Sequence, residues 1–557
     1  MNHLAWEKDG SMRGINGSFF SGFNRIQSLG LILATMAGLA LSVPVNAQQT
    51  KNRPADESNR LWLAGAASVE ITPPAEAKAW LAGYAARKEP NTGVEQPIYA
   101  KALVITQPGG EPLALVTLDL IGIRRPITRR VADRIESRFG IPRKSLILFS
   151  SHTHSAPIPN DSTDKWEIYG IDGNTVAPNI EFTTELENKI VDVVGKAMLS
   201  RRPAKLEHAE GNAAFAVNRR EATKDGFKIG LNPDGPTDHS VPVLKVTDLQ
   251  SNKPLAIMFG YACHNTTLGS EQMKICGDYA GYAQASLEKA NPGTVAMFVT
   301  GCAGDQNPNP RGTLELAKKH GETLASAVTS AISGKTRPIQ GTLRSIHSEP
   351  VLHFAGPVDR YSYQSRLSDK GGPRDAHARR LINILAAGNV IDRSYVFPIQ
   401  VVSFGDDLLM VALAGEVVVD YSLNIKAKHN KPNRPLWVSA YANDVFGYVP
   451  STRILREGGY EGGEAFYYSN FPTPLANDTE RIIMDEVRRM IDQLAEYPLG
   501  SPSLTPAVAS PLAPNSPRIL DPSATPAPAA AETTGTTNPV PATPAPSTPA
   551  VVPAPAP

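Results

Sequence analysis

The sequence is poor in cysteine. Only Cys263, Cys276 and Cys302 occur among its 557 residues. Three thiols cannot all pair within one chain, and this argues against a fold that depends on a disulfide framework. One disulfide bond and three buried thiols both remain compatible with this number.

The sequence also lacks an excess of either charge. Lys and Arg together number 55, and Asp and Glu together number 54. This balance gives no reason to expect a nucleic acid or an anionic membrane as a partner. Beyond Lys51, no segment is long and apolar enough to cross a bilayer.

One uncharged stretch near the start is typical of an export signal. No charged residue lies between Ile26 and Lys51, and residues 29–41 form an apolar block. The block is followed by Val45-Asn46-Ala47, which has the small-x-small pattern of a cleavage site. We therefore expect a signal peptide over residues 1–47 and a secreted or periplasmic mature protein.

The last part of the chain contains no aromatic residue. Residues 500–557 consist mainly of Pro, Ala, Thr and Ser. Such a segment cannot bury enough apolar surface to offset the entropy of the chain. We expect a disordered tail here, and a single large folded domain over residues 58–499.

Within that domain, apolar runs alternate with amphipathic patterns. Strands are predicted at 102–105, 113–118, 146–149, 243–246, 255–261, 295–299 and 408–413. Helices are predicted at 129–139, ending at Gly140, at 314–332, ending at Gly334, and at 480–494. A further helix is expected after a capping box formed by Thr184 and Glu187. The pattern predicts an α/β fold with mixed β-sheets covered by α-helices.

Two histidines follow the predicted strand 146–149. Side chains alternate along a strand, so His152 and His154 are expected to point the same way. Two neutral imidazoles can hold Zn²⁺, or one can hold it while the other moves protons. The simpler alternative is a pair of polar residues where a strand leaves for a loop.

A second strand, 255–261, also leads to a histidine. Alternation places Cys263 and His264 on opposite faces, so they are not expected to bind one metal together. The loop 301–309 is rich in Gly and Asn, which lets a backbone turn sharply and approach a ligand. The alternative for His264 is a histidine that is hydrogen-bonded within the core. The alternative for the loop is a short connection between a strand and a helix.

Taken in order, these motifs resemble the N-terminal catalytic domain of the neutral, non-lysosomal ceramidase family. The members of this family are zinc-dependent amidases that cleave the N-acyl bond of ceramide. The residues that carry the resemblance are 65–74, 97–103, 151–155, 217–219, 263–264, 281–283, 304–305, 415–416, Tyr448 and 460–461.

The resemblance implies a role for seven side chains. Zinc would be bound by His152, His264, Glu416 and Tyr448, a set that includes good zinc ligands. His154 would act beside the zinc and shuttle a proton to the leaving amine, Arg219 would bind the substrate, and Tyr460 would hold the substrate oxygen.

The chain departs from the family at one position. The family carries a serine, sometimes assigned as nucleophile, in a Gly-Asp-x-Ser-Pro-Asn context, and here Asn307 occupies that position. An amide nitrogen is a very poor nucleophile, so we expect zinc-activated water to attack and Asn307 to form hydrogen bonds.

Three functions are therefore compared. The first is a zinc-dependent hydrolase of ceramide or a related N-acyl lipid, and the second is a zinc hydrolase of another amide or ester. The third is a non-catalytic surface protein that retains the fold. The expected partner is a lipid or N-acyl small molecule, with contact to a membrane surface or envelope and the oligomeric state left open.

Overall fold

The computed structural model describes residues 61–74, 76–160, 171–368, 371–469 and 471–496. Among these, the residues up to Ile491 form one compact unit, and residues 492–496 belong to a second. The predicted signal peptide (1–47) and tail (500–557) lie outside the described residues, as do both ends of the range 58–499, so this division stays a prediction. No helix in the described ranges is long and apolar enough to cross a membrane.

The largest sheet follows the order β12-β10-β9-β6-β1-β3-β4-β5, and β14 pairs with β6. Its pairs β4–β5 and β10–β12 are parallel, whereas the others are antiparallel. The strands are β1 (Trp62–Glu70), β3 (Tyr99–Thr106), β4 (Leu113–Leu118), β5 (Leu146–Ser150), β6 (Arg202–Asn212), β9 (Ser240–Asp248), β10 (Pro254–Tyr261), β12 (Val295–Thr300) and β14 (Arg337–Ile339).

The sheet curls so that its two end strands meet. The Thr300 hydroxyl at the end of β12 donates to the Ser150 carbonyl at the end of β5 over 2.8 Å. The carboxyl ends of parallel strands are a frequent place for ligands in α/β folds, because the loops that follow them converge there. The loops after β5, β10 and β12 carry the histidines and the Gly-rich segment singled out in the sequence.

A second sheet packs against the first. Its order is β15 (Leu343–Ser348), β18 (Ile399–Phe404), β19 (Leu409–Leu413) and β21 (Leu436–Ser439). Phe149, Met258 and Trp437 belong to one buried cluster that draws on both sheets. Each such side chain contributes roughly 1.5–3 kcal/mol when fully buried.

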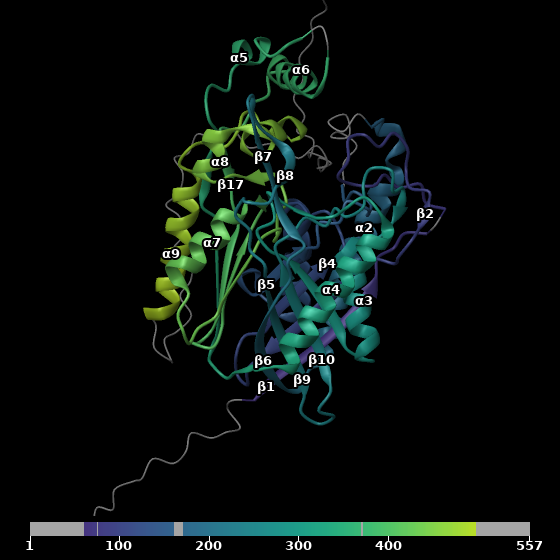
Figure 1. The fold of residues 1–557 in the computed structure, drawn as a ribbon, viewed down its shortest axis with the longest axis vertical. Coiled ribbons are helices and arrows are strands. Elements are labelled where there is room, and N and C mark those ends of the chain that lie inside the picture. Colours follow the sequence, from purple (N-terminus) through teal and green to yellow (C-terminus); the bar gives the residue numbers. More distant parts are fainter. Residues whose placement is uncertain (1–60, 75, 161–170, 369–370, 470, 497–557) are drawn as a thin grey trace, which may run out of the picture. The chain divides into compact units, whose positions relative to one another are not determined.

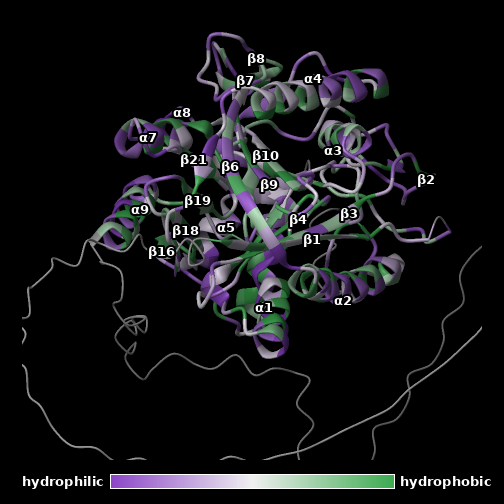
Figure 2. Cartoon of the chain, turned by 90° about the horizontal axis from the view of Figure 1, so that it is seen from below, coloured by the Kyte–Doolittle hydropathy of each residue, from purple (hydrophilic) through white to green (hydrophobic). Residues whose placement is uncertain are grey.

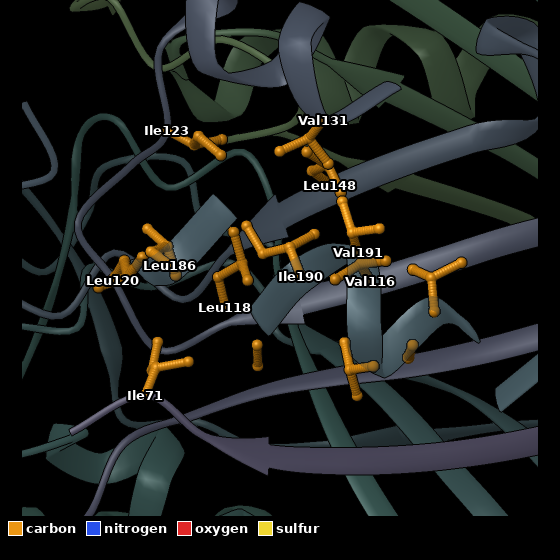
Figure 3. Packing of buried hydrophobic residues seen from close by; sticks show 14 of the residues in the cluster. Ile71, Val116, Leu118, Leu120, Ile123, Val131, Leu148, Leu186, Ile190 and Val191 are labelled. Atoms are coloured by element: carbon orange, nitrogen blue, oxygen red, sulfur yellow. The ribbon is translucent and has the colours of Figure 1, made fainter. Parts of the chain in front are cut away.

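Helices cover the sheets, and most of them carry both hydrophobic and hydrophilic residues (Figure 2). In Figure 1, α2, α3 and α4 lie on one side of the strands, and α7, α8 and α9 lie on the other. Val131 of α1 and Ile190 and Val191 of α2 pack against Val116 and Leu148 (Figure 3). The helices are α1 (Arg125–Phe139), α2 (Ala177–Leu199), α3 (Asp278–Ala290), α4 (Leu314–Ser333), α5 (Arg360–Gln364), α6 (Pro373–Ala386), α7 (Val419–His429), α8 (Thr452–Glu457) and α9 (Thr479–Glu496). The predicted fold class is thereby confirmed.

The helix ends show where local sequence signals were sufficient. Gly140 caps α1 in the left-handed conformation, with φ 65° and its N–H bonded to the Glu136 carbonyl, as predicted. The predicted capping box of α2 was wrong. The helix begins at Ala177, so Thr184 lies inside it and its hydroxyl donates to the Ile180 carbonyl at 3.1 Å.

Four short pairings complete the framework. Three of them are β2 (Gly93–Val94) with β11 (Lys274–Ile275), β16 (Val351–His353) with β17 (Ser394–Val396), and β13 (Gln306–Pro308) with β7 (Ala216–Thr223) and β8 (Gly226–Asn232). The fourth, β20 (Glu416–Val417) with β22 (Tyr448–Val449), sets Glu416 directly opposite Tyr448.

The three cysteines are buried and free.

Candidate metal centre

His152 and His154 lie together, but for a different reason from the one predicted. Strand β5 ends at Ser150, and His152 has a φ of 63°, so strand alternation does not extend to these residues. The turn instead brings His154 Nε2 to 3.2 Å from His152 Nε2. The Nδ1 atom of His152 lies 2.6 Å from the Ile121 carbonyl oxygen, which orients the ring.

His264 reaches the same place from β10. Its backbone N–H donates to the Gln306 carbonyl at 3.0 Å, and its Nδ1 lies 2.6 Å from the Ala303 carbonyl oxygen. The neighbouring Cys263 is buried in a separate apolar cluster, so the two side chains do point apart. The imidazole of His264 stands perpendicular to that of His152, with ring centroids 4.7 Å apart.

Glu416 and Tyr448 face these histidines from the β20–β22 pair. The Oε2 atom of Glu416 lies 3.1 Å from His152 Nε2 and 3.3 Å from His264 Nε2. The Tyr448 hydroxyl lies 3.3 Å from His264 Nε2. A close approach of backbones makes this possible, because a Cβ at Gly304 would stand 2.6 Å from the Glu416 carbonyl oxygen.

The cluster of His152, His264 and Glu416 has more hydrogen-bond acceptors than protons to donate to them. A carbonyl only accepts, so the Nδ1 atoms of His152 and His264 must be protonated donors, and in the neutral imidazoles this leaves a lone pair on each Nε2. Both lone pairs face Glu416 Oε2, which has no hydrogen-bond partner among the described residues. Converging buried acceptors repel one another unless a proton donor or a cation lies between them. The residues therefore fit a divalent metal with nitrogen and oxygen ligands, such as Zn²⁺.

His154 also belongs to this group geometrically. The ligand atoms of His152, His154 and His264 all lie within 4.8 Å of one another, so a three-histidine set is a second arrangement of ligands. The backbone of Gly83, at φ +92°, packs so closely that a Cβ there would lie 2.1 Å from His154 Nδ1. That Nδ1 is buried without a hydrogen-bond partner among the described residues.

Arg219 links the cluster to its surroundings. It is buried on β7 and donates from Nη2 to the Tyr448 hydroxyl at 2.9 Å, and from Nε to Glu461 at 2.8 Å. Its Nη1 donates to Asn307 Oδ1 at 3.3 Å, because β13 pairs with β7. Tyr460 completes the set, with its ring 5.3 Å from that of Tyr448. All eight sequence-predicted residues are thus in one neighbourhood.

Burial dominates the electrostatics of the centre. Burial, with Arg219 nearby, lowers the pKa of His264 to about 3, so this imidazole is neutral at pH 7. Burial, with His152 and His264 nearby, holds the pKa of His154 well below its usual value. Burial also raises the pKa of the phenols of Tyr448 and Tyr460. Neutral imidazoles are the form that binds metals and accepts protons.

The structure adds two residues that the sequence did not assign a role. Glu461 binds Arg219 and, at 2.7 Å, Arg220, a partnership that no spacing in the sequence indicates. Tyr441 is fully buried with a φ of 54°, and its ring lies 4.5 Å from that of His152. No pattern in the sequence points to Tyr441. The structure marks it by its positive φ, because a non-glycine residue keeps this conformation only where the surrounding packing enforces it.

Comparison with known proteins adds an independent finding. A family model described as neutral/alkaline non-lysosomal ceramidase, N-terminal, matches residues 62–343. Neutral ceramidase B of Dictyostelium discoideum is 28% identical over 291 residues, which cover 49% of this chain and 38% of that protein. Neutral ceramidase 2 of Arabidopsis thaliana is 21% identical over 338 residues, which cover 56% of this chain and 42% of that protein. The chain thus matches less than half of the length of these relatives.

Solved structures share the fold. A structure described as a ceramidase complexed with C2 superposes with a TM-score of 0.61 at 17% identity, over 80% of this chain and 77% of that one. The neutral ceramidase from Pseudomonas aeruginosa gives a TM-score of 0.59 at 18% identity, over 80% and 76% of the two chains. At such low identity these superpositions concern the fold alone.

Proposed function

Because this chain belongs to the neutral/alkaline non-lysosomal ceramidase family, we propose that it is a zinc-dependent amidohydrolase that cleaves the N-acyl amide bond of ceramide or a related N-acyl lipid. The observation that carries the proposal is the convergence of two imidazole lone pairs on one buried carboxylate oxygen. The names of the relatives support ceramide as the first substrate to test.

The metal would be held by His152, His264, Glu416 and Tyr448. Their Nε2, carboxylate and phenol atoms form a nitrogen and oxygen donor set that suits zinc. The carbonyls of Ile121 and Ala303 orient the two imidazoles from behind, as outer hydrogen bonds commonly do for zinc-binding histidines. When bound, zinc acts as a Lewis acid that polarises a carbonyl and lowers the pKa of water.

His154 is the residue proposed to move the proton. It is neutral, and its Nε2 lies at the edge of the metal cluster, 3.2 Å from His152 Nε2. In this position it can take a proton from the attacking water and give it to the leaving amine nitrogen. Gly83 and Tyr84 hold its ring in place, the latter with ring centroids 4.9 Å apart.

Two residues are proposed to hold the substrate amide, and Arg219 is proposed to position one of them. Among the described residues, the Tyr460 hydroxyl makes no hydrogen bond, so it can donate to the carbonyl oxygen as charge develops there. Arg219 holds the side chains of Tyr448 and Asn307 in position by donating a hydrogen bond to each. Asn307 accepts from Arg219 and Thr266 through Oδ1, which leaves its Nδ2 hydrogens to donate to the substrate.

Export is proposed on sequence grounds alone. The apolar block and cleavage pattern between Ile26 and Lys51 support a secreted or periplasmic protein, and they lie outside the described residues. A substrate other than ceramide, amide or ester, and a non-catalytic role are alternative outcomes of the experiment below.

The test combines metal analysis with a substrate panel. Protein purified without chelator is expected to hold about one zinc per chain and to release fatty acid from ceramides or other N-acyl lipids. His152→Ala should lose both zinc and turnover, whereas His353→Ala, a change at an exposed histidine paired with Asp478, should lose neither. Zinc far below one per chain, with no hydrolysis of any amide or ester, would reject the enzyme in favour of a non-catalytic protein. Turnover of esters or simple amides alone would reject the N-acyl lipid.

A further inference from the structure

We propose that Arg87 is a positioning residue for the amide hydrolysis and that it acts by fixing the orientation of His154. The proposal rests on the proposed function, in which His154 moves the proton. In the described part of the chain, no hydrogen bond of Arg87 reaches a candidate metal ligand, so its effect would pass through His154.

The three histidines of the centre differ in what orients their rings. The Nδ1 atoms of His152 and His264 each lie 2.6 Å from a backbone carbonyl oxygen. The Nδ1 of His154 is buried without a hydrogen-bond partner among the described residues. The orientation of His154 must therefore come from packing around its ring and from the backbone that carries it.

Arg87 binds that backbone. Its side chain is buried, and its five N–H donors all face backbone carbonyls. The acceptors are the carbonyls of Ala82 and His154 for Nη1, at 2.6 and 2.5 Å, of Gln272 and Gly269 for Nη2, at 2.8 and 3.4 Å, and of Ser270 for Nε, at 3.3 Å. These carbonyls belong to the loops that follow β1, β5 and β10. One guanidinium thus joins three loops at the backbone of His154.

Tyr84 provides a second route from Arg87 to His154. The guanidinium carbon of Arg87 lies 4.9 Å from the centroid of the Tyr84 ring, and this ring lies 4.9 Å from the imidazole of His154. The Tyr84 hydroxyl donates to the Leu268 carbonyl at 2.7 Å, which fixes the far end of the ring. Arg87 therefore acts on both the backbone and the side chain of His154.

The charge of Arg87 is not what the geometry uses. Burial lowers the pKa of its guanidinium to about 10, so the group remains charged at pH 7, yet its acceptors are neutral carbonyls. A lysine would keep the charge but has three donors on one atom and cannot reproduce a planar fork of five. Arg87→Lys therefore removes the junction of the three loops and retains the charge.

Arg143 offers a matched control. Burial lowers the pKa of its guanidinium to about 10 as well, and its Nη1 donates to the Leu146 carbonyl at 2.9 Å. Leu146 begins β5, whereas His154 follows the other end of that strand. Arg143→Lys thus makes the same chemical change at a place that does not contact His154.

The experiment measures kcat and KM in the wild type, Arg87→Lys, His154→Ala and the double variant. Arg87→Lys is expected to lower kcat by about 10- to 100-fold, the size of effect that a small displacement of a catalytic group has, and to leave KM within about 2-fold. In the His154→Ala background the same change should lower kcat by less than about 2-fold, because the group that it positions is absent. Arg143→Lys should leave kcat unchanged in both backgrounds.

An equal loss of kcat in both backgrounds would overturn the proposal, because Arg87 would then act on the structure in general. Unchanged kcat in Arg87→Lys would overturn it as well. If Arg87→Lys does not fold, Tyr84→Leu replaces it in the same cycle, and the same two outcomes decide.

A second measurement does not depend on turnover and separates failure of this proposal from failure of the proposed function. In protein with isotope-labelled histidine, the NMR signal of the His154 ring is assigned by its absence in His154→Ala. This signal should shift in Arg87→Lys and keep its position in Arg143→Lys. If the wild type hydrolyses no substrate, the proposed function fails and the NMR signal decides, and an unchanged signal in Arg87→Lys would overturn the role of Arg87.

Discussion

Two buried polar clusters lie side by side in this molecule and differ in how their hydrogen bonds balance. The candidate metal centre brings together His152, His264 and Glu416 with more lone pairs than protons. The neighbouring arginine cluster pairs Arg219 and Arg220 with Glu457 and Glu461, at N–O distances of 2.7 to 3.1 Å. Tyr448 connects the two through its bond to Arg219.

This difference in hydrogen bonding distinguishes a cluster that binds a ligand from a cluster that holds neighbouring side chains in position. A buried group left without a partner costs free energy, so an unbalanced cluster persists where something else completes it. A balanced cluster needs no ligand and can hold its neighbours in position. On this account the metal centre does the chemistry, and the arginine cluster fixes Tyr448 and Asn307.

The largest expected effect within the centre, apart from loss of a metal ligand, is at His154. His154→Ala should slow hydrolysis by the ~10² to 10⁴-fold typical of a lost acid or base, while zinc remains bound. Steady-state kinetics with zinc determination on the same sample checks this. Loss of zinc together with turnover would instead make His154 a ligand, as the three-histidine arrangement allows.

A smaller effect is expected where the two clusters meet at Asn307. Asn307→Ala should cost about 1.5–4 kcal/mol of transition-state stabilisation, the range for one hydrogen bond, because the side chain donates and does not attack. Asn307→Ser, which restores the family residue, should keep or improve activity on N-acyl lipids. Gain of turnover in Asn307→Ser from an inert wild type would show that the serine was the nucleophile.

Acid should weaken the arginine cluster. Burial alone would raise the pKa of Glu461, but Arg219 outweighs it and holds this pKa below its usual 4.5. The stabilising effect of the ionised carboxylate is therefore complete above pH 4.5 and is lost as the pH falls through the lower pKa of the folded state. Urea unfolding of wild type and Glu461→Gln should show a stability difference at pH 7 that shrinks as the pH is lowered below 4.5. A constant difference would contradict this assignment.

Much of the fold could be predicted from the sequence because it depends on local signals. The apolar runs 113–118 and 146–149 coincide with β4 and β5, and Gly140 and Gly334 end α1 and α4. The start of α2 was missed because Thr184 and Glu187 form a capping pattern that the longer helix overrides, with Pro178 in its first turn.

The candidate site was predicted by resemblance more than by local pattern. His152 and His154 were placed together by strand alternation, whereas a left-handed backbone at His152 brings them together in the structure. Nothing local joins Arg219 to Glu461 or Tyr441 to His152, since these contacts arise from the pairing and packing of distant segments. The imbalance of protons at Glu416 could be recognised only from coordinates.

One pair of substitutions tests the central claim directly. Glu416→Gln and Glu461→Gln make the same chemical change in the two clusters, and thermal and urea unfolding would be measured after removal of metal. In the metal centre the new amide can donate to an imidazole lone pair, so metal-free Glu416→Gln should be at least as stable as wild type. In the arginine cluster the change leaves buried guanidinium groups underpaired and should cost about 3–5 kcal/mol.

Added zinc should then stabilise the wild type much more than Glu416→Gln, because binding to the folded state raises stability in proportion to affinity. In the metal-free protein, the account predicts that Glu461→Gln is destabilising and that Glu416→Gln is not. Equal destabilisation by both would contradict it, because Glu416 would then be a structural carboxylate like Glu461.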